Sequence, residues 1–329
     1  MTMRKNNRRA GIAERICPAY RTITQCGWIF VLSLLMLTSG GCQVFQRFRT
    51  NKQEAPIVLA ETSSLPQVIA KINEQSRRVN TLKTDARISV DGMPNLRGDL
   101  VLERPDNLRL KAGLMGMSEM GFDLGTNKDL FWVWKKMNTP GDPPTLYYAY
   151  HDEYRNSAIK EQLQLQPKWL LEGIGLIEFS PESINSKPRN DGLLEIASRD
   201  PLDPNGPFRV AVVDPRRGLI LQQTFYTAQG NRLAYINSVD HRFYAEKNVS
   251  LPGRLEIHVF DPEGRETKMA VYFGEFAINA FYGDRDAMWS MPNPGDVPKI
   301  NLSEVGKQAV ETEAAAEVSR NWDPHTHRR

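Results

Sequence analysis

Apolar residues alternate with polar ones along much of the stretch from residue 96 to residue 137. A period of two places every second side chain on the same face of a β-strand. Turn-forming runs such as Arg104-Pro105-Asp106-Asn107 and Thr126-Asn127-Lys128-Asp129 separate the alternating segments. The pattern predicts an antiparallel meander with one apolar face. That face either packs a core or also receives a ligand.

Strand patterns return after a polar loop, which we predict at residues 181–191. Turn residues such as those of Asp261-Pro262-Glu263-Gly264 separate the new segments. Short strands at regular spacing are typical of a sandwich or a barrel. The predicted strands are 192–197, 208–213, 219–227, 233–239, 254–260 and 267–273.

Two regions have helical spacing instead. Between residues 64 and 82, Leu65, Val68, Ile69 and Ile72 fall on one side of a helix that Ser64 can cap. A helix with one apolar stripe has to lay it on another surface, and the meander is the nearest one. Between residues 156 and 175 the spacing predicts two short helices broken at Pro167.

The first 41 residues have the three parts of an export signal. Basic residues come first, residues 27–37 are apolar, and small residues end at Cys42. The apolar segment is shorter than the roughly 20 residues that a membrane-spanning helix needs. The small residues before Cys42 resemble a bacterial lipobox, with Ser39 where that motif usually has Leu. The resemblance implies acylation of Cys42, for instance by palmitate, and Gln43 is compatible with the outer membrane. The alternatives are an uncleaved anchor and a plain signal peptide.

The charge distribution points away from nucleic acid as a partner. The formal net charge is +3, yet residues 1–41 carry six Lys and Arg against one Glu, so the leader has +5 and the rest −2. The basic character therefore belongs to the leader. Of the three cysteines, Cys17 and Cys26 also lie in the leader. Cleavage would leave Cys42 and no internal disulfide, and lipidation accounts for a single exported thiol.

We expect no catalytic site, no metal and no cofactor. Ser118 lies in Gly116-Met117-Ser118-Glu119-Met120, which lacks the second glycine of a nucleophile elbow. Asp240 and His241 are adjacent, and adjacent strand residues point to opposite faces. The aromatic residues near residue 132 could stack on nucleic acid or sugar, but a barrel core is the commoner use of such residues.

Two groups of motifs together resemble the lipoprotein-sorting family of the Gram-negative envelope, LolA and LolB. Gly98-Asp99-Leu100 followed by Arg104-Pro105 resembles the second strand of the soluble carrier, and 127–132 resembles its next hairpin. Met115-Gly116 falls where the receptor has an exposed hairpin tip, and 167–173 resembles the end of a receptor helix. The resemblance covers roughly residues 64–290 and implies a mainly β fold, an antiparallel half-open β-barrel with short lid helices.

The resemblance also assigns roles to single residues. Arg104 would hold the helical lid to the barrel as a latch. Leu114, Met115, Met117 and Met120 would form a hairpin tip that contacts membrane or cargo, and unbranched methionine suits a variable lipid surface. An acyl chain outside a bilayer needs an apolar cavity. The candidates for its wall are Leu100, Leu102, Leu108, Leu110, Phe122, Leu124, Trp132, Trp134 and Trp169.

The sequence therefore predicts a lipid-anchored envelope protein that faces the periplasm, at the outer membrane. Its expected partners are acyl chains of lipids or lipoproteins, the membrane through Cys42, and an envelope lipoprotein carrier. The alternative is a structural or assembly lipoprotein whose barrel is filled by side chains and takes no lipid. The predicted parts are a signal peptide at 1–41, a lipidated tether at 42–63, the half-barrel at 64–298 and a disordered or frayed-helical tail at 299–329.

Overall fold

The computed structural model describes residues 54–114, 117–137, 143–157, 167–199, 206–261, 264–280 and 283–305. These residues belong to the compact unit from Gln53 to Arg329. The predicted leader, Cys42, Met115 and the chain beyond residue 305 lie outside them.

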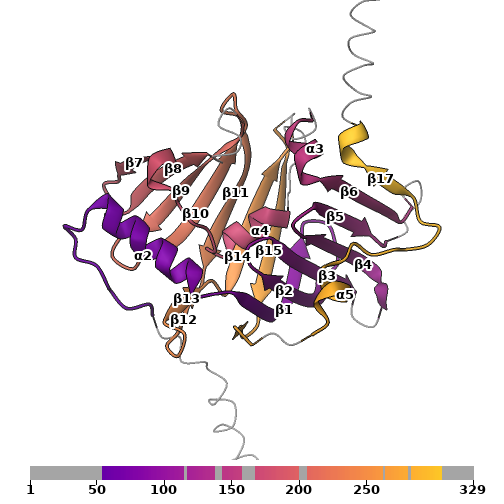
Figure 1. Ribbon diagram of the computed structural model, residues 1–329, viewed down its shortest axis with the longest axis horizontal. Helices are drawn as coiled ribbons and strands as arrows, with labels where there is room; N and C mark the ends of the chain where they lie inside the picture. Colours follow the sequence, from indigo (N-terminus) through magenta and orange to yellow (C-terminus); the bar gives the residue numbers. More distant parts are fainter. Residues whose placement is uncertain are drawn as a thin grey trace, which may run out of the picture. The chain divides into compact units, whose positions relative to one another are not determined.

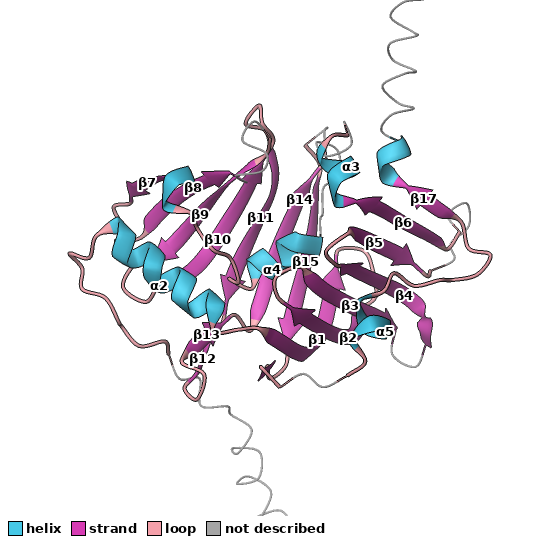
Figure 2. Ribbon diagram, in the orientation of Figure 1, coloured by secondary structure: helices cyan, strands magenta, loops and turns pink. Residues whose placement is uncertain are grey.

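The predicted meander, residues 96–137, lies within the first half of one large sheet (Figures 1 and 2). Each strand pairs antiparallel with the next, so sequence order and sheet order coincide, as short turns between neighbouring strands require. The strands are β1 (Thr81–Val90), β2 (Leu96–Glu103), β3 (Asn107–Leu114), β4 (Met117–Thr126), β5 (Leu130–Lys135) and β6 (Thr145–Tyr150).

The second half of the sheet joins the first where β15 pairs antiparallel with β1. From there the order is β15-β14-β11-β10-β9-β8-β7, so the sheet has β7 at one edge. In the described ranges the sheet does not close, and the chain is mainly β, as predicted. The strands are β7 (Ile184–Pro188), β8 (Leu194–Arg199), β9 (Phe208–Asp214), β10 (Leu219–Tyr226), β11 (Arg232–Val239), β14 (Arg254–Phe260) and β15 (Glu266–Phe273).

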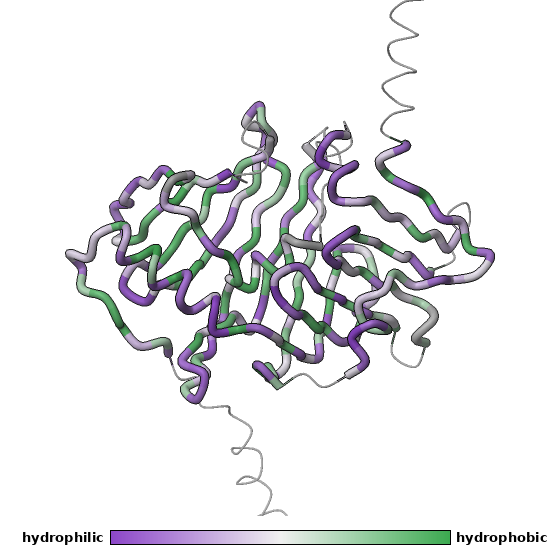
Figure 3. Tube along the Cα trace, in the orientation of Figure 1, coloured by the Kyte–Doolittle hydropathy of each residue, from purple (hydrophilic) through white to green (hydrophobic). Residues whose placement is uncertain are grey.

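The helices α2 and α4 lie on the same face of the sheet. Cross-strand partners share a face, and the register places Ala211, Gln223, Ile236 and Ile257 in one row across β9, β10, β11 and β14. The helix α2 (Leu65–Arg77) covers the β8–β10 end of that face through Val68, Ile69 and Ile72. The helix α4 (Pro167–Gly173) lies over the middle, against β11 and β14. Figure 3 shows apolar and polar positions following one another along many of the strands.

The helix predicted at 64–82 ends at Arg77, and β1 already begins at Thr81. The helix begins after Ser64, as predicted. The Gln67 side-chain oxygen accepts a hydrogen bond from the Ser64 N–H at 2.8 Å, which caps this end of the helix. Val79 and Leu82, which the helical pattern included, are instead buried in the main core. The strand β1 therefore includes residues 81 and 82 of the range that was predicted to be helical. Pro167 begins α4, within the range predicted for the second short helix. Most of the range predicted for the first, residues 158–166, lies outside the described residues, and α3 (His151–Arg155) lies before that range.

The tail boundary predicted at residue 299 is wrong. The strand β17 (Lys299–Asn301) pairs in parallel with β6 and covers that edge of the sheet. The short helix α5 (Arg285–Trp289) precedes it on the outer face. Arg109 of β3 donates from Nη1 to the backbone oxygen of Met288 at 2.7 Å, which ties this segment to the sheet. Unpredicted elements also include β7, the hairpin of β12 (Arg242–Tyr244) and β13 (Val249–Leu251), and β16 (Ala277–Ile278).

Candidate functional site

A cavity of about 580 Å³ lies on the helix-covered side of the sheet. One side of its lining comes from the turns after β2 and β4 together with α3. The opposite side comes from β8, β9, β10 and β11, and α4 and residues 176–180 complete it. The volume is in the range of small-molecule sites, about 300–1,000 Å³.

Aromatic and aliphatic side chains form the deep part of this cavity. Trp169 of α4 stacks on Phe225 of β10, with ring centroids 4.6 Å apart and planes 19° apart. Leu171 and Leu233 lie beside them, and all four belong to the main hydrophobic core. The cavity therefore opens directly onto the core, so a ligand there meets apolar surface.

Buried side chains of two strands hold α4 in place. A short helix leaves its last carbonyls without intrahelical partners. Gln223 of β10 donates to the Glu172 carbonyl at 2.5 Å, and Ser238 of β11 donates to the Gly173 carbonyl at 2.7 Å. Gly173 allows the close approach, since a Cβ there would lie 3.1 Å from atoms of both Ile236 and Leu255. The position of Trp169 is set by these contacts.

Arg104 connects the turn after β2 to the helix-covered side, where a latch was predicted. Its Nη1 donates to the Ser76 carbonyl at the end of α2, and its Nη2 to Glu178 Oε1, both at 2.6 Å. Arg77 also bonds Glu178, at 2.7 Å. Burial raises the pKa of the Glu178 carboxyl, but hydrogen bonds from Arg104 and Arg77 outweigh burial and hold that pKa below its usual value.

Residues 176–180 are joined to α2 as well. The Asn73 side chain donates to the Phe179 carbonyl at 2.9 Å and accepts from the Phe179 N–H at 2.8 Å. Both groups are buried, so these two bonds replace contacts with water that the backbone has lost. The helix and the segment form one unit, named here the lid (Leu65–Arg77 with residues 176–180), and the segment lines the cavity.

Nine side chains were predicted to line an apolar cavity, and all nine belong to described residues. Trp169 lines this cavity, and the other eight side chains do not line it. Five of the eight are core residues, and Phe122 is partly buried against them. Their side chains meet one another and α4 rather than an open space. The five are Leu100, Leu102, Leu108, Leu110 and Leu124.

Trp132 and Trp134 lie on the opposite face of the sheet, so their prediction is corrected. The register pairs Trp132 with Gly125 and Trp134 with Asp123, whereas Leu124 pairs with Val133. Trp132 is fully buried there, beside the ion pair of Arg109 and Asp123. A Cβ at Gly125 would lie 2.2 Å from the indole, so this glycine makes room for it.

The predicted hairpin tip divides. Met117 and Met120 are 57% and 40% exposed, whereas Leu114 is partly buried against the main core. Met115 lies outside the described residues. The exposed pair remains available for an interface, and the role stays a prediction.

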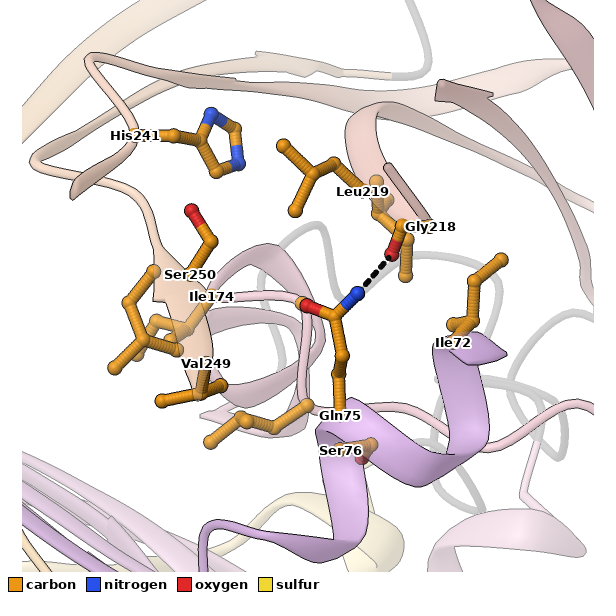
Figure 4. A pocket seen from close by; sticks show the side chains of 13 residues that line it. Ile72, Gln75, Ser76, Ile174, Gly218, Leu219, His241, Val249 and Ser250 are labelled. Carbon is orange, nitrogen blue, oxygen red and sulfur yellow. Dashed lines mark hydrogen bonds between the residues drawn. The ribbon is translucent and has the colours of Figure 1, made fainter. Parts of the chain in front are cut away.

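A second pocket, of about 20 Å³, lies between the end of α2 and β13 (Figure 4). That volume accommodates one water molecule and excludes larger ligands. His241 lines it, and burial lowers its pKa to about 4, against the opposing effects of a hydrogen bond to Ile220 and the charge of Asp240. Asp240 pairs with Arg254 at 3.6 Å and is not part of this lining. The described residues therefore do not assemble the acid–base pair considered above.

The sequence reasoning missed the charged part of the large cavity. Arg209 of β9 pairs with Glu172 of α4 at 3.0 Å, and both side chains are largely buried. Arg199 and Phe208 also contribute to the lining, and the Arg199 guanidinium lies 4.8 Å from the centroid of the Phe208 ring. The strand patterns include Phe208, Phe225 and Leu233 without a break. No signal in the sequence therefore indicated that a cavity, rather than more hydrophobic core, lies beside these residues.

Within the described ranges, no group of three or more His, Cys, Asp or Glu side chains is arranged to hold a metal ion. In the same part of the chain, none of the helices has the length and apolar character needed to span a bilayer.

No protein-family model and no curated protein matches the chain. Solved structures similar to it include an outer membrane lipoprotein-sorting protein domain from Vibrio parahaemolyticus, at 10% identity and a TM-score of 0.46, covering 68% of this chain and 97% of that one. A LolA superfamily protein from Nitrosomonas europaea matches at 12% identity and a TM-score of 0.43, covering 70% and 99%. A protein from Desulfovibrio piger, of a family of unknown function, matches at 6% and 0.44, covering 69% and 100%. The first two carry the names of the family that the sequence motifs resemble. The TM-scores of these three structures are below 0.5.

Proposed function

We propose that this protein binds the acyl chain of a lipid or lipoprotein non-covalently in the large cavity and catalyses no reaction on it. The observation that carries the proposal is the cavity of about 580 Å³, whose deep part is the stacked pair of Trp169 and Phe225. A cavity that opens onto the hydrophobic core offers an acyl chain the surroundings it has in a bilayer.

The hydrophobic effect supplies the driving force. Burying a methylene group gains about 0.8 kcal/mol, so a sixteen-carbon chain gains about 12 kcal/mol before the costs of association. Those costs are several kcal/mol, so the net affinity suits reversible binding.

Access to the cavity is controlled by the lid in this proposal. Residues 176–180 line the cavity and are bonded to α2 through Asn73. Arg104 holds the end of α2 and Glu178 to the turn after β2. Releasing this guanidinium would remove its two side-chain bonds between the turn after β2 and the lid, which is the action expected of a latch.

The cellular setting is proposed from the sequence. Acylation of Cys42 would anchor the chain to the envelope, facing the periplasm at the outer membrane, where a lipoprotein carrier could deliver cargo. The exposed Met117 and Met120 would contact the membrane or the incoming chain. Metabolic labelling with alkyne palmitate tests the anchor, because Cys42→Ser should abolish labelling and Cys26→Ser should not.

Photo-crosslinking tests the binding site in the full-length chain. Membranes containing the protein are incubated with a palmitate analogue that carries a diazirine near its methyl end. After irradiation, the labelled residues are mapped by mass spectrometry. We expect labels on cavity residues such as Trp169, Phe225 and Leu233. Labels confined to the exposed surface would contradict the proposal.

A cavity-filling variant sharpens this test. Ser183 lines the cavity, so Ser183→Trp should reduce labelling at least fivefold. Ser186 is an exposed residue of β7, and Ser186→Trp is the matched control. Equal labelling of both variants would instead favour the scaffold function, for which the filled core between the meander and α4 is the supporting observation.

A further inference from the structure

A row of side chains on the helix-covered face changes from polar to apolar inside the large cavity. The strand register places Ser198 of β8, Arg209 of β9 and Phe225 of β10 directly opposite one another, so the three share a face. All three line the cavity. Trp169 of α4 stacks on Phe225, so the apolar end of the row is the place proposed above for an acyl chain.

The polar end of this row identifies a group that a ligand would carry beside its chain. We propose that Arg209 donates a hydrogen bond to the neutral carbonyl group, ester or amide, that links a bound acyl chain to the rest of its molecule. Arg209 is then a residue that determines specificity. This inference rests on the proposed function and adds the chemical group that is recognised next to the chain.

The Arg209 guanidinium is held in place by three neighbours. Its Nε donates to Ser198 Oγ at 3.0 Å, and its Nη1 lies 3.0 Å from Glu172 Oε1. Its central carbon lies 5.6 Å from the centroid of the Phe179 ring. The Arg209 side chain is 17% exposed. A donor that is fixed before its ligand arrives loses little conformational freedom on binding.

Arg209 also has N–H groups to offer. A guanidinium carries five N–H donors on three nitrogens. Among the described residues, Nε and Nη1 have partners, and the structure shows no hydrogen bond from Nη2. Residues that lie directly opposite on neighbouring strands have Cβ atoms about 4.5–5.5 Å apart. An acceptor bonded to Arg209 would therefore lie next to a chain that packs on Phe225.

The charges around Arg209 favour a neutral acceptor. Glu172 already neutralises Arg209, and Glu178, another carboxylate of the lining, pairs with Arg104. An anionic head group bonded to Arg209 would lie close to Glu172, and like charges repel. A carbonyl oxygen only accepts, and a hydrogen bond from a charged donor is about twice as strong as a neutral one. An amide would also bring an N–H that the Glu172 carboxylate can accept.

Competition against the diazirine palmitate probe tests the inference in the full-length chain. The unlabelled competitors are N-methyldodecanamide, methyl dodecanoate, dodecyl methyl ether, which lacks the carbonyl, and dodecanoate. Each is used below the concentration at which it aggregates. A hydrogen bond to a charged group corresponds to about a tenfold change in affinity. We therefore expect half-effective concentrations about tenfold lower for the amide, the ester or both than for the ether and dodecanoate.

Paired substitutions separate recognition by Arg209 from packing. Glu172→Leu/Arg209→Leu removes both charges together, so neither is left buried without its partner, and the backbone bond from Gln223 to residue 172 is kept. The preference for the carbonyl compounds over the ether should fall to about twofold or less, with competition by the ether itself little changed. Arg254→Leu/Glu256→Leu is the control. It removes an ion pair, 3.1 Å between Nη2 and Oε1, from the opposite face of the sheet and should retain the preference.

A second probe locates the carbonyl group in the wild-type chain, without any variant. This probe is an N-methyl palmitamide whose diazirine is placed beside the carbonyl carbon rather than near the methyl end. After irradiation, we expect its labels on the row of Ser198, Arg209 and Phe225. Labels elsewhere, with none on this row, would overturn the inference while leaving acyl-chain binding intact.

The remaining outcomes distinguish this inference from the proposed function. If the ether or dodecanoate competes as well as both carbonyl compounds, the carbonyl contact is wrong and acyl-chain binding stands. A preference that survives in Glu172→Leu/Arg209→Leu assigns the ion pair a structural role only and also overturns the inference. Either ranking of amide and ester supports it, and the better competitor identifies the linkage. If the palmitate probe labels no cavity residue at all, the proposed function itself fails.

Discussion

Replacing Arg104 by alanine should loosen the lid at the end of α2. The change removes a hydrogen bond to the Ser76 carbonyl and an ion pair with Glu178, each with an N···O distance of 2.6 Å. Hydrogen bonds to charged groups contribute about 1.5–3 kcal/mol each. The Arg104 side chain is 17% exposed and Glu178 keeps its bond to Arg77, so we expect a total loss of about 2 kcal/mol.

Hydrogen exchange followed by mass spectrometry measures this loss locally. A free-energy change of 1.4 kcal/mol is a factor of ten, so a loss of about 2 kcal/mol should speed exchange at the end of α2 about 25-fold. The Val79 N–H reports directly, because it donates to the same Ser76 carbonyl at 3.2 Å.

Arg77→Ala is the matched control. Arg77 bonds the same Glu178 carboxylate, but its side chain is 65% exposed, and exposed ion pairs contribute at most about 1 kcal/mol. Exchange at the end of α2 should therefore rise about fivefold or less. If Arg104→Ala speeds exchange no more than Arg77→Ala does, the description of Arg104 as the latch of the lid is refuted.

Three further predictions concern other parts of the chain. Arg109→Met should lower the free energy of unfolding, measured in urea, by about 3–5 kcal/mol, because it leaves Asp123 charged and buried without its ion-pair partner. The double variant Arg109→Met/Asp123→Leu should lose less of this free energy than Arg109→Met alone. Burial lowers the pKa of His241 in the folded chain to about 4, from an ordinary value of 6.5. As the pH is lowered, His241 therefore takes up a proton in the unfolded chain before it does so in the folded chain. The free energy of unfolding should fall by about 3 kcal/mol as the pH drops from about 6.5 to about 4, and His241→Phe should remove this dependence on pH. Met117→Asp with Met120→Asp should change the free energy of unfolding by less than about 0.5 kcal/mol but reduce crosslinking of the tip to a photoreactive phospholipid at least fivefold; unchanged crosslinking would exclude the tip as a membrane contact.

Much of the strand order follows from local pattern. Alternating positions and turn residues predict the meander and the six later strands, because apolar side chains recur at every second position in much of their length. The short strands were missed for the opposite reason. In β7 four of five residues are exposed, and β17 has three residues whose partner is the distant β6. Neither strand carries an alternation to recognise.

The sequence also indicated two residues of the candidate site. Arg104 lies where the motif resemblance placed a latch, and Trp169 lines the cavity. The contact between Arg104 and Glu178 spans 74 residues, and nothing in the local sequence around Glu178 indicates it. Long-range polar contacts of this kind depend on how the lid meets the turn after β2.

The sequence by itself determined which residues alternate in each strand, where the turns fall and that one face of the meander is apolar. Tertiary structure decided on which face Trp132 and Trp134 lie, since period two defines two faces and pairing with Gly125 and Asp123 selects between them. The tertiary structure also decided where the large cavity lies. The leucines of the meander pack against one another and α4, whereas the cavity lies where the lid, α4 and β8–β11 leave a gap. A gap is a property of several elements packed together, so no single stretch of the chain encodes it.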